Sequence, residues 1–164
     1  MCKSNGICYI NKVILGGKII GKKGEPLNLV ELIRKNGEPV LDKNGNPVKK
    51  LEFTVSVIDQ LRGKDENGYY YTNDIRCTAF GGTAAFIARN FIGQSGIYIE
   101  GFENTSKYEV DGQMRYSKTV VVGSVNFNGT PVPKNEDVVS QENAPEDAGF
   151  AEELEDEDLG LPFN

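Results

Sequence analysis

The chain has 164 residues and a formal net charge of −6, which is divided unevenly along it. Residues 1–133 carry 17 Lys/Arg against 13 Asp/Glu, whereas residues 134–164 carry one lysine against 11 acids. The length leaves no room for a second sizeable domain, and neither an apolar signal core nor a run of about 18 apolar residues is present. We therefore expect one intracellular, soluble domain, residues 1–133, and a disordered acidic tail, residues 134–164.

The residue types disfavour an enzyme. The chain has no histidine, which is the commonest general base and the commonest metal ligand. Its three cysteines are odd in number and have no zinc-like spacing, and no phosphate loop or nucleophile elbow is present. We expect no catalytic residue, no cofactor and no metal. The enzyme alternative is a metal-dependent nuclease that uses Asp59, Asp65 or Asp74.

The first predicted strand spans residues 11–20 and is rich in Val, Ile and Leu. Its alternation places Val13, Leu15 and Ile19 on one face, with Lys12 and Lys18 on the other. The Gly-Gly pair inside it indicates a strand bend or bulge, with a phosphate cradle as the alternative.

Residues 24–50 are more polar and contain the near repeat Lys-Asn-Gly-Glu-Pro-Val and Lys-Asn-Gly-Asn-Pro-Val, at 35–40 and 43–48. Asn-Gly is a strong turn signal, so this excursion is predicted to be hairpin-like or a long loop.

Two more strands follow. Residues 51–58 alternate as a half-buried strand, 64–68 make a turn, and 69–80 return as the third strand. On this third strand we expect Ile75, Cys77 and Ala79 to share one face. Arg76 and Phe80 would then lie on the polar face.

A short helix is predicted over residues 83–92, with Thr83 as its N-cap and Gly93 ending it. The strands 97–109 and 113–127 would be joined by a two-residue turn at Asp111-Gly112. Five strands with one helix between the third and fourth is the order of an all-β OB-fold, a Greek-key barrel that binds oligonucleotides or oligosaccharides.

Counting outward from that turn pairs Tyr108 with Arg115 and Lys107 with Tyr116, so each pair joins an aromatic ring to a cation. Single-stranded nucleic acid requires this mixture, because bases stack on rings while Lys and Arg neutralise phosphates. The predicted binding surface comprises Lys12, Lys18, Arg76, Phe80, Lys107, Tyr108, Arg115 and Tyr116. Each residue alone is also compatible with ordinary packing or solvation, and the prediction depends on their combination.

Several segments together resemble the bacterial and phage single-stranded DNA-binding protein family over about residues 10–128. They are Asn11-Lys12-Val13-Ile14-Leu15, Ala79-Phe80-Gly81, Ile97-Tyr98-Ile99-Glu100-Gly101, and Gly112-Gln113-Met114-Arg115-Tyr116 followed by Val120-Val121-Val122. The resemblance implies a homo-oligomer, usually a tetramer, that binds single-stranded DNA with little sequence preference in replication, recombination and repair.

The resemblance also bears on single residues. Phe80 and Tyr108 fall where the family places stacking aromatics, and Arg76 falls at a familiar basic position. Two further aromatic positions of the family are Leu61 and Asp74 here. These departures concern wrapping and affinity more than function.

The tail ends in Leu-Gly-Leu-Pro-Phe-Asn after a run of acids, and is similar to the family's partner-docking tip. The residues expected to dock replication, recombination and repair proteins are Asp156, Asp158, Leu161, Pro162 and Phe163. Asn164 follows Phe163, whereas family members commonly end at the Phe. The alternative is a terminus that merely improves solubility.

Two other readings of the whole chain are an RNA-binding or cold-shock-like protein and a scaffold whose acidic tail mimics nucleic acid. The resemblance to the single-stranded DNA-binding family implies a protein of the cytoplasm of a bacterium or phage-infected host, associated with the nucleoid and with no membrane partner.

Overall fold

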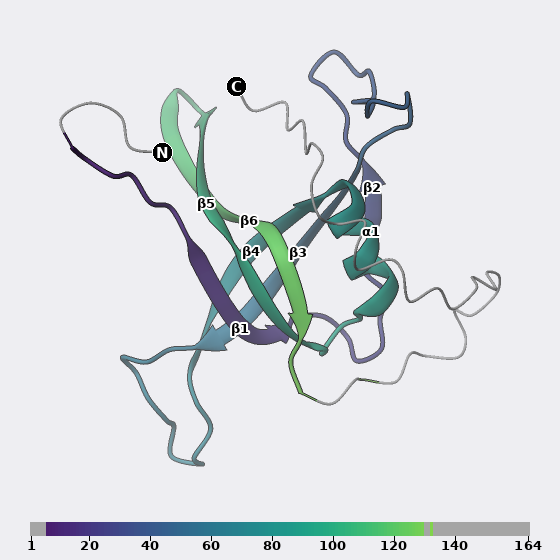
Figure 1. The fold of residues 1–164 in the computed structure, drawn as a ribbon. Helices are drawn as coiled ribbons and strands as arrows, with labels where there is room; N and C mark the ends of the chain where they lie inside the picture. The colour runs from purple at the N-terminus through teal and green to yellow at the C-terminus, as the bar shows by residue number, and fades with distance from the viewer. Residues whose placement is uncertain (1–5, 130–131, 133–164) are drawn as a thin grey trace.

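The computed structural model describes residues 6–129 and 132 and shows a closed β-barrel with one helix (Figure 1). Its elements lie in the order β1 (Val13–Ile19), β2 (Leu29–Glu31), β3 (Lys49–Ile58), β4 (Thr72–Phe80), α1 (Gly81–Asn90), β5 (Gly96–Val110) and β6 (Gln113–Phe127). The predicted all-β OB-fold is confirmed, with β2 as an additional short strand. The predicted tail and its docking tip lie outside the described residues.

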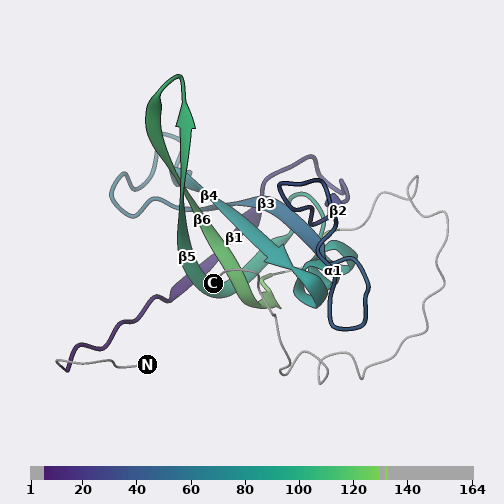
Figure 2. The ribbon, with the colours of Figure 1, turned by 90° about the horizontal axis from the view of Figure 1, so that it is seen from above.

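The sheet order is β1-β5-β6-β4-β3-β2, and a further pairing of β1 with β3 closes the barrel. All pairs are antiparallel except β4 with β6, which run parallel. Among the described strands, β2 pairs only with β3 and so extends the sheet beside the closed barrel. This closure leaves the long β5–β6 hairpin projecting beyond the barrel (Figure 2).

The core follows from the alternation of the strands. Leu15 and Ile19 of β1 are buried, while Lys12 and Lys18 are exposed, as predicted. The strand β3 buries Leu51, Phe53 and Val55. The remaining members of the core cluster are Cys77, Ala79, Ala84, Ile87, Phe91, Ile97, Ile99, Val120 and Val122.

The polar-face prediction for Phe80 is wrong, because its side chain is only 7% exposed. The last four residues of β4, Cys77 to Phe80, are all buried, so the alternation stops there. Both faces of this strand end are therefore covered, and α1 follows it directly. A strand end covered on both faces cannot keep a polar side.

The helix begins three residues earlier than an N-cap at Thr83 predicts, at Gly81, and it ends at Asn90 rather than just before Gly93. Phe80 is the N-cap residue and makes no side-chain cap hydrogen bond, so Thr83 lies inside the helix and the predicted cap is wrong. Ala84, Ile87 and Phe91 form an apolar stripe that packs into the core, since all three are buried. No helix in the described part of the chain is long and apolar enough to cross a membrane.

The near repeat within residues 24–50 folds as two small hairpins, bridged at Ile33–Pro39 and at Leu41–Pro47. Three backbone hydrogen bonds join their bases in a ring: Leu32 N to Val48 O at 2.8 Å, Val48 N to Val40 O at 2.8 Å and Val40 N to Leu32 O at 2.9 Å. Each repeat therefore forms one hairpin turn, and the valine that ends it, Val40 or Val48, takes part in the ring of hydrogen bonds.

Candidate nucleic-acid interface

The β5–β6 hairpin has the predicted turn and register. Asp111 and Gly112 have φ values of 52° and 75°, the left-handed backbone of a two-residue hairpin turn. Tyr108 lies opposite Arg115, and Lys107 lies opposite Tyr116. The Lys107 ammonium is 5.8 Å from the centroid of the Tyr116 ring, so this pair forms a cation–π contact.

An open groove of about 530 Å³ runs between this hairpin and the start of β4. Its lining includes Val13, Asp74, Ile75, Arg76, Glu103, Tyr108, Tyr116, Ser117, Lys118 and Val120. The rings are available to a ligand, because Tyr108 is 45% exposed and Tyr116 is 61% exposed. The groove therefore combines aromatic surface with charged side chains of both signs.

The groove brings together three of the eight predicted binding residues, namely Arg76, Tyr108 and Tyr116. Lys107 and Arg115 lie on the same hairpin, directly opposite the two tyrosines. The other three, Lys12, Lys18 and Phe80, do not line the groove. Lys12 forms a 3.5 Å ion pair with Glu100, Lys18 is exposed near the β1–β3 contact, and Phe80 is buried.

The formal charges of the residues that line the groove cancel. The hairpin has no excess of positive charge either, since Lys107, Arg115 and Lys118 stand against Glu100, Glu103, Glu109 and Asp111. Arg76 and Lys118 face Asp74 and Glu103 among the lining residues. The Lys118 ammonium is 3.2 Å from a Glu103 carboxylate oxygen, and both side chains are well exposed. Such exposed pairs exchange partners at little cost, so Lys118 can contact a phosphate instead.

Sequence reasoning did not select Lys118. It lies two residues beyond Tyr116 on the same strand, so the period of two places it on the same face of the hairpin. The alternation that selected Tyr116 therefore contained the signal for Lys118.

A second group of aromatics and cations was also missed. Tyr69, Tyr70 and Tyr71 end the loop that joins β3 to β4, and all three are exposed. Arg62 lies over the Tyr71 ring and Lys64 lies over the Tyr70 ring. Three consecutive tyrosines close to two cations in the sequence were the available signal. The predicted strand 69–80 includes these tyrosines, whereas β4 begins at Thr72.

The acids of the nuclease alternative do not converge. Asp59 binds Arg62 within the loop, the Asp65 carboxylate caps the backbone of the next turn, and Asp74 lies in the groove. Among the described residues, no group of three or more His, Cys, Asp or Glu side chains could hold a metal ion.

These features define the class: an OB-fold domain with a groove of aromatic and charged side chains suited to nucleic acid. The sequence model of the Single-strand binding protein family matches residues 36–128, which include β3 to β6 and α1. The chain belongs to this family, and membership implies that it binds single-stranded DNA. No curated protein matches the chain in sequence.

Proposed function

We propose that this protein binds and protects single-stranded DNA with little sequence preference during replication, recombination and repair. The observation that carries the proposal is the groove in which Tyr108 and Tyr116 lie with Arg76. Rings accept any base by stacking, because every base has a π-face, and a guanidinium neutralises the phosphate backbone without reading sequence. No catalytic step is part of this proposal.

The proposed organisation has two parts. Residues 1–133 form the binding domain, and residues 134–164 form an acidic tail that recruits partner proteins through Asp156, Asp158, Leu161, Pro162 and Phe163. We further propose a homo-oligomer, a tetramer by resemblance to the family, that acts in the cytoplasm on exposed DNA strands.

The tail can also compete with DNA. It carries one lysine and 11 acids, whereas residues 1–133 carry an excess of four positive charges. A linked polyanion raises the local concentration of negative charge near a basic surface. Removing residues 134–164 should therefore raise the affinity for DNA at low salt, and an unchanged affinity would contradict this competition.

The main test is fluorescence anisotropy of a labelled oligo-dT of about 35 nucleotides, long enough for several OB-fold sites of about 4–16 nucleotides each. The label is needed because the chain has no tryptophan. We expect tight binding that weakens with salt, and little affinity for the matching duplex. Equal affinity for duplex and single strand would reject the proposal, and a preference for the ribo-oligomer would favour an RNA-binding protein.

A further inference from the structure

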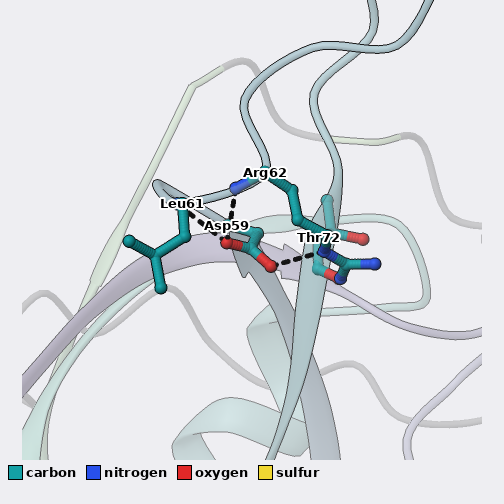
Figure 3. A network of polar contacts seen from close by, with 4 residues as sticks. All are labelled: Asp59, Leu61, Arg62 and Thr72. Carbon is teal, nitrogen blue, oxygen red and sulfur yellow. Dashed lines mark hydrogen bonds and ion pairs between the residues drawn. The ribbon is translucent and has the colours of Figure 1, made fainter.

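The Asp59 carboxylate organises the base of the loop between β3 and β4, residues 59–71 (Figure 3). Asp59 Oδ1 accepts hydrogen bonds from the backbone N–H groups of Leu61, at 2.9 Å, and Arg62, at 3.1 Å. Its other oxygen accepts from Arg62 Nε at 2.6 Å, and Arg62 Nη2 donates to the Thr72 carbonyl at 3.2 Å. The guanidinium therefore links the start of the loop to the first residue of β4.

The backbone closes the same loop. Asp59 N donates to Tyr71 O at 2.8 Å, and Tyr71 N donates to Gly63 O at 3.0 Å. An isolated bridge between Lys64 and Tyr70 continues the pairing outward. These contacts fix the main chain at Tyr70 and Tyr71.

Each tyrosine ring has a cation over one face. The Arg62 guanidinium carbon lies 5.1 Å from the Tyr71 ring centroid, and the Lys64 ammonium lies 4.8 Å from the Tyr70 ring centroid. The side chains of Tyr70 and Tyr71 are still 50% and 43% exposed. Both rings are thus braced from one side and open to solvent elsewhere.

We propose that Tyr70 and Tyr71 form a second stacking subsite for the bases of single-stranded DNA, separate from the groove that contains Tyr108 and Tyr116. This inference rests on the proposed function. A ring already held by a cation loses little conformational freedom when a base stacks on it, so less of the stacking energy is spent on ordering.

The position of the subsite fits a continuous DNA path. Tyr71 directly precedes β4, and Arg76 of the same strand lines the groove. At about 3.3 Å per residue, these two positions are roughly 16 Å apart along the strand. One single strand can therefore reach both sites by following β4.

The charges of the loop indicate how this subsite binds. Arg62 is already paired with Asp59, and the acids Asp65 and Glu66 lie at the tip of the loop. The Asp65 carboxylate is engaged by the backbone N–H groups of Asn67 and Tyr69, both at 2.9 Å. The loop therefore offers aromatic surface without an excess of positive charge, and its contribution should be nearly independent of salt.

The test compares full-length chains by anisotropy with labelled oligo-dT at two salt concentrations. Tyr70→Ala and Tyr71→Ala should each weaken binding by about 5- to 150-fold, the equivalent of ~1–3 kcal/mol of base stacking. The slope of affinity against salt should not change, because no phosphate contact is removed. Tyr70→Phe and Tyr71→Phe keep the rings and should bind like the native chain. Tyr9→Ala, which removes an exposed tyrosine outside the loop, is the matched control.

The outcomes separate this inference from the proposed function. If the native chain does not bind oligo-dT, both fail. If the native chain binds and the alanine variants bind as Tyr9→Ala does, the second subsite is rejected while the proposed function stands. A shallower salt slope, or an equal loss in the phenylalanine variants, would also overturn stacking.

A tryptophan reporter covers the case in which the alanine variants do not fold. Tyr71→Trp places the chain's single tryptophan in the loop. Stacking on thymine should quench its emission as oligo-dT saturates the protein. Unchanged emission at saturation would overturn the inference.

Discussion

The side chain of Asn11 forms two hydrogen bonds with the backbone of Glu103. Asn11 Nδ2 donates to the Glu103 carbonyl at 2.8 Å, and Glu103 N donates to Asn11 Oδ1 at 3.1 Å. The β1–β5 ladder ends at Val13 and Gly101, so the amide replaces one further backbone pair. It joins the segment before β1 to the strand that continues into the projecting hairpin.

Replacing Asn11 should therefore loosen this junction. We expect Asn11→Ala to lower the free energy of unfolding by about 1 kcal/mol, since each exposed bond contributes modestly. Urea unfolding measures the change. Asn104→Ala is the control, because Asn104 makes no side-chain hydrogen bond to any described residue. Equal stability of the two variants would contradict the role of Asn11.

The two glycines of β1 have different roles. A Cβ on Gly17 would overlap the carbonyl oxygen of Ser56 on β3, whereas the nearest atom to a Cβ on Gly16 is Asn128 Nδ2 at 3.8 Å. Gly17 thus permits the close approach of β1 to β3 that closes the barrel. The register of β1 with β5 is unbroken from Val13 to Lys18, so the Gly-Gly pair makes no bulge in this ladder.

Gly17→Ala should destabilise the barrel by about 1–3 kcal/mol, as expected when backbone must shift to admit a methyl group. Gly16→Ala should leave the stability unchanged or slightly raise it, since alanine restricts the unfolded chain. Thermal unfolding of the Gly17→Ala and Gly16→Ala variants measures the difference. Similar melting temperatures would contradict the prediction, because they would show that the barrel tolerates a wider β1–β3 gap.

We expect Phe80 to stabilise the folded protein through its buried side chain. Truncating a buried phenylalanine typically costs about 3–5 kcal/mol, so Phe80→Ala should be severely destabilised. Phe102→Ala, at a residue 36% exposed on the hairpin, should lose much less. Denaturant unfolding compares the two. A stable Phe80→Ala chain that binds oligo-dT weakly would instead restore the ring to the DNA-binding surface.

The sequence predicted those features that depend on neighbouring residues. The period of two located the long strands, and Asp111-Gly112 set the register that places Tyr108 opposite Arg115. The burial of Phe80 was not predictable in the same way, because it depends on contacts with distant segments of the chain, and Phe80 lies opposite Lys50 of β3. Local alternation carries no information about such a contact.

In the candidate site, too, the features set by neighbouring residues were predictable and those set by long-range contacts were not. Of the hairpin residues of the groove, turn and register predict Tyr108 and Tyr116. The groove itself also needs Asp74, Ile75 and Arg76, which β4 brings to the hairpin through long-range pairing. The predicted strand 69–80 includes the loop tyrosines, because nothing in their spacing reveals that the Asp59 carboxylate organises the base of the loop 59–71.

Cys77 predicts a loss of stability at alkaline pH. Burial raises the pKa of its thiol to about 12, from an ordinary value of 9.0. Between these values the unfolded chain releases the proton and the folded chain keeps it, so the free energy of unfolding falls as pH rises above about 9. Unfolding of Cys77→Ala should depend less steeply on pH over this interval, whereas Cys8→Ala, at an exposed thiol, should match the native slope. Parallel pH profiles for all three chains would contradict the assignment.

Arg76 separates phosphate binding from base stacking. It is exposed in the groove and forms no ion pair with another described residue, so its charge is available to the DNA backbone. Arg76→Gln should weaken oligo-dT binding and reduce the magnitude of the slope of log affinity against log salt by about 0.7, the value for one phosphate contact on a single strand. Arg34→Gln, in the first small hairpin, should leave both unchanged. An unaltered slope in Arg76→Gln would place the phosphate contacts on the hairpin cations instead. The tyrosine variants of the loop should show the opposite pattern, a loss of affinity at constant slope.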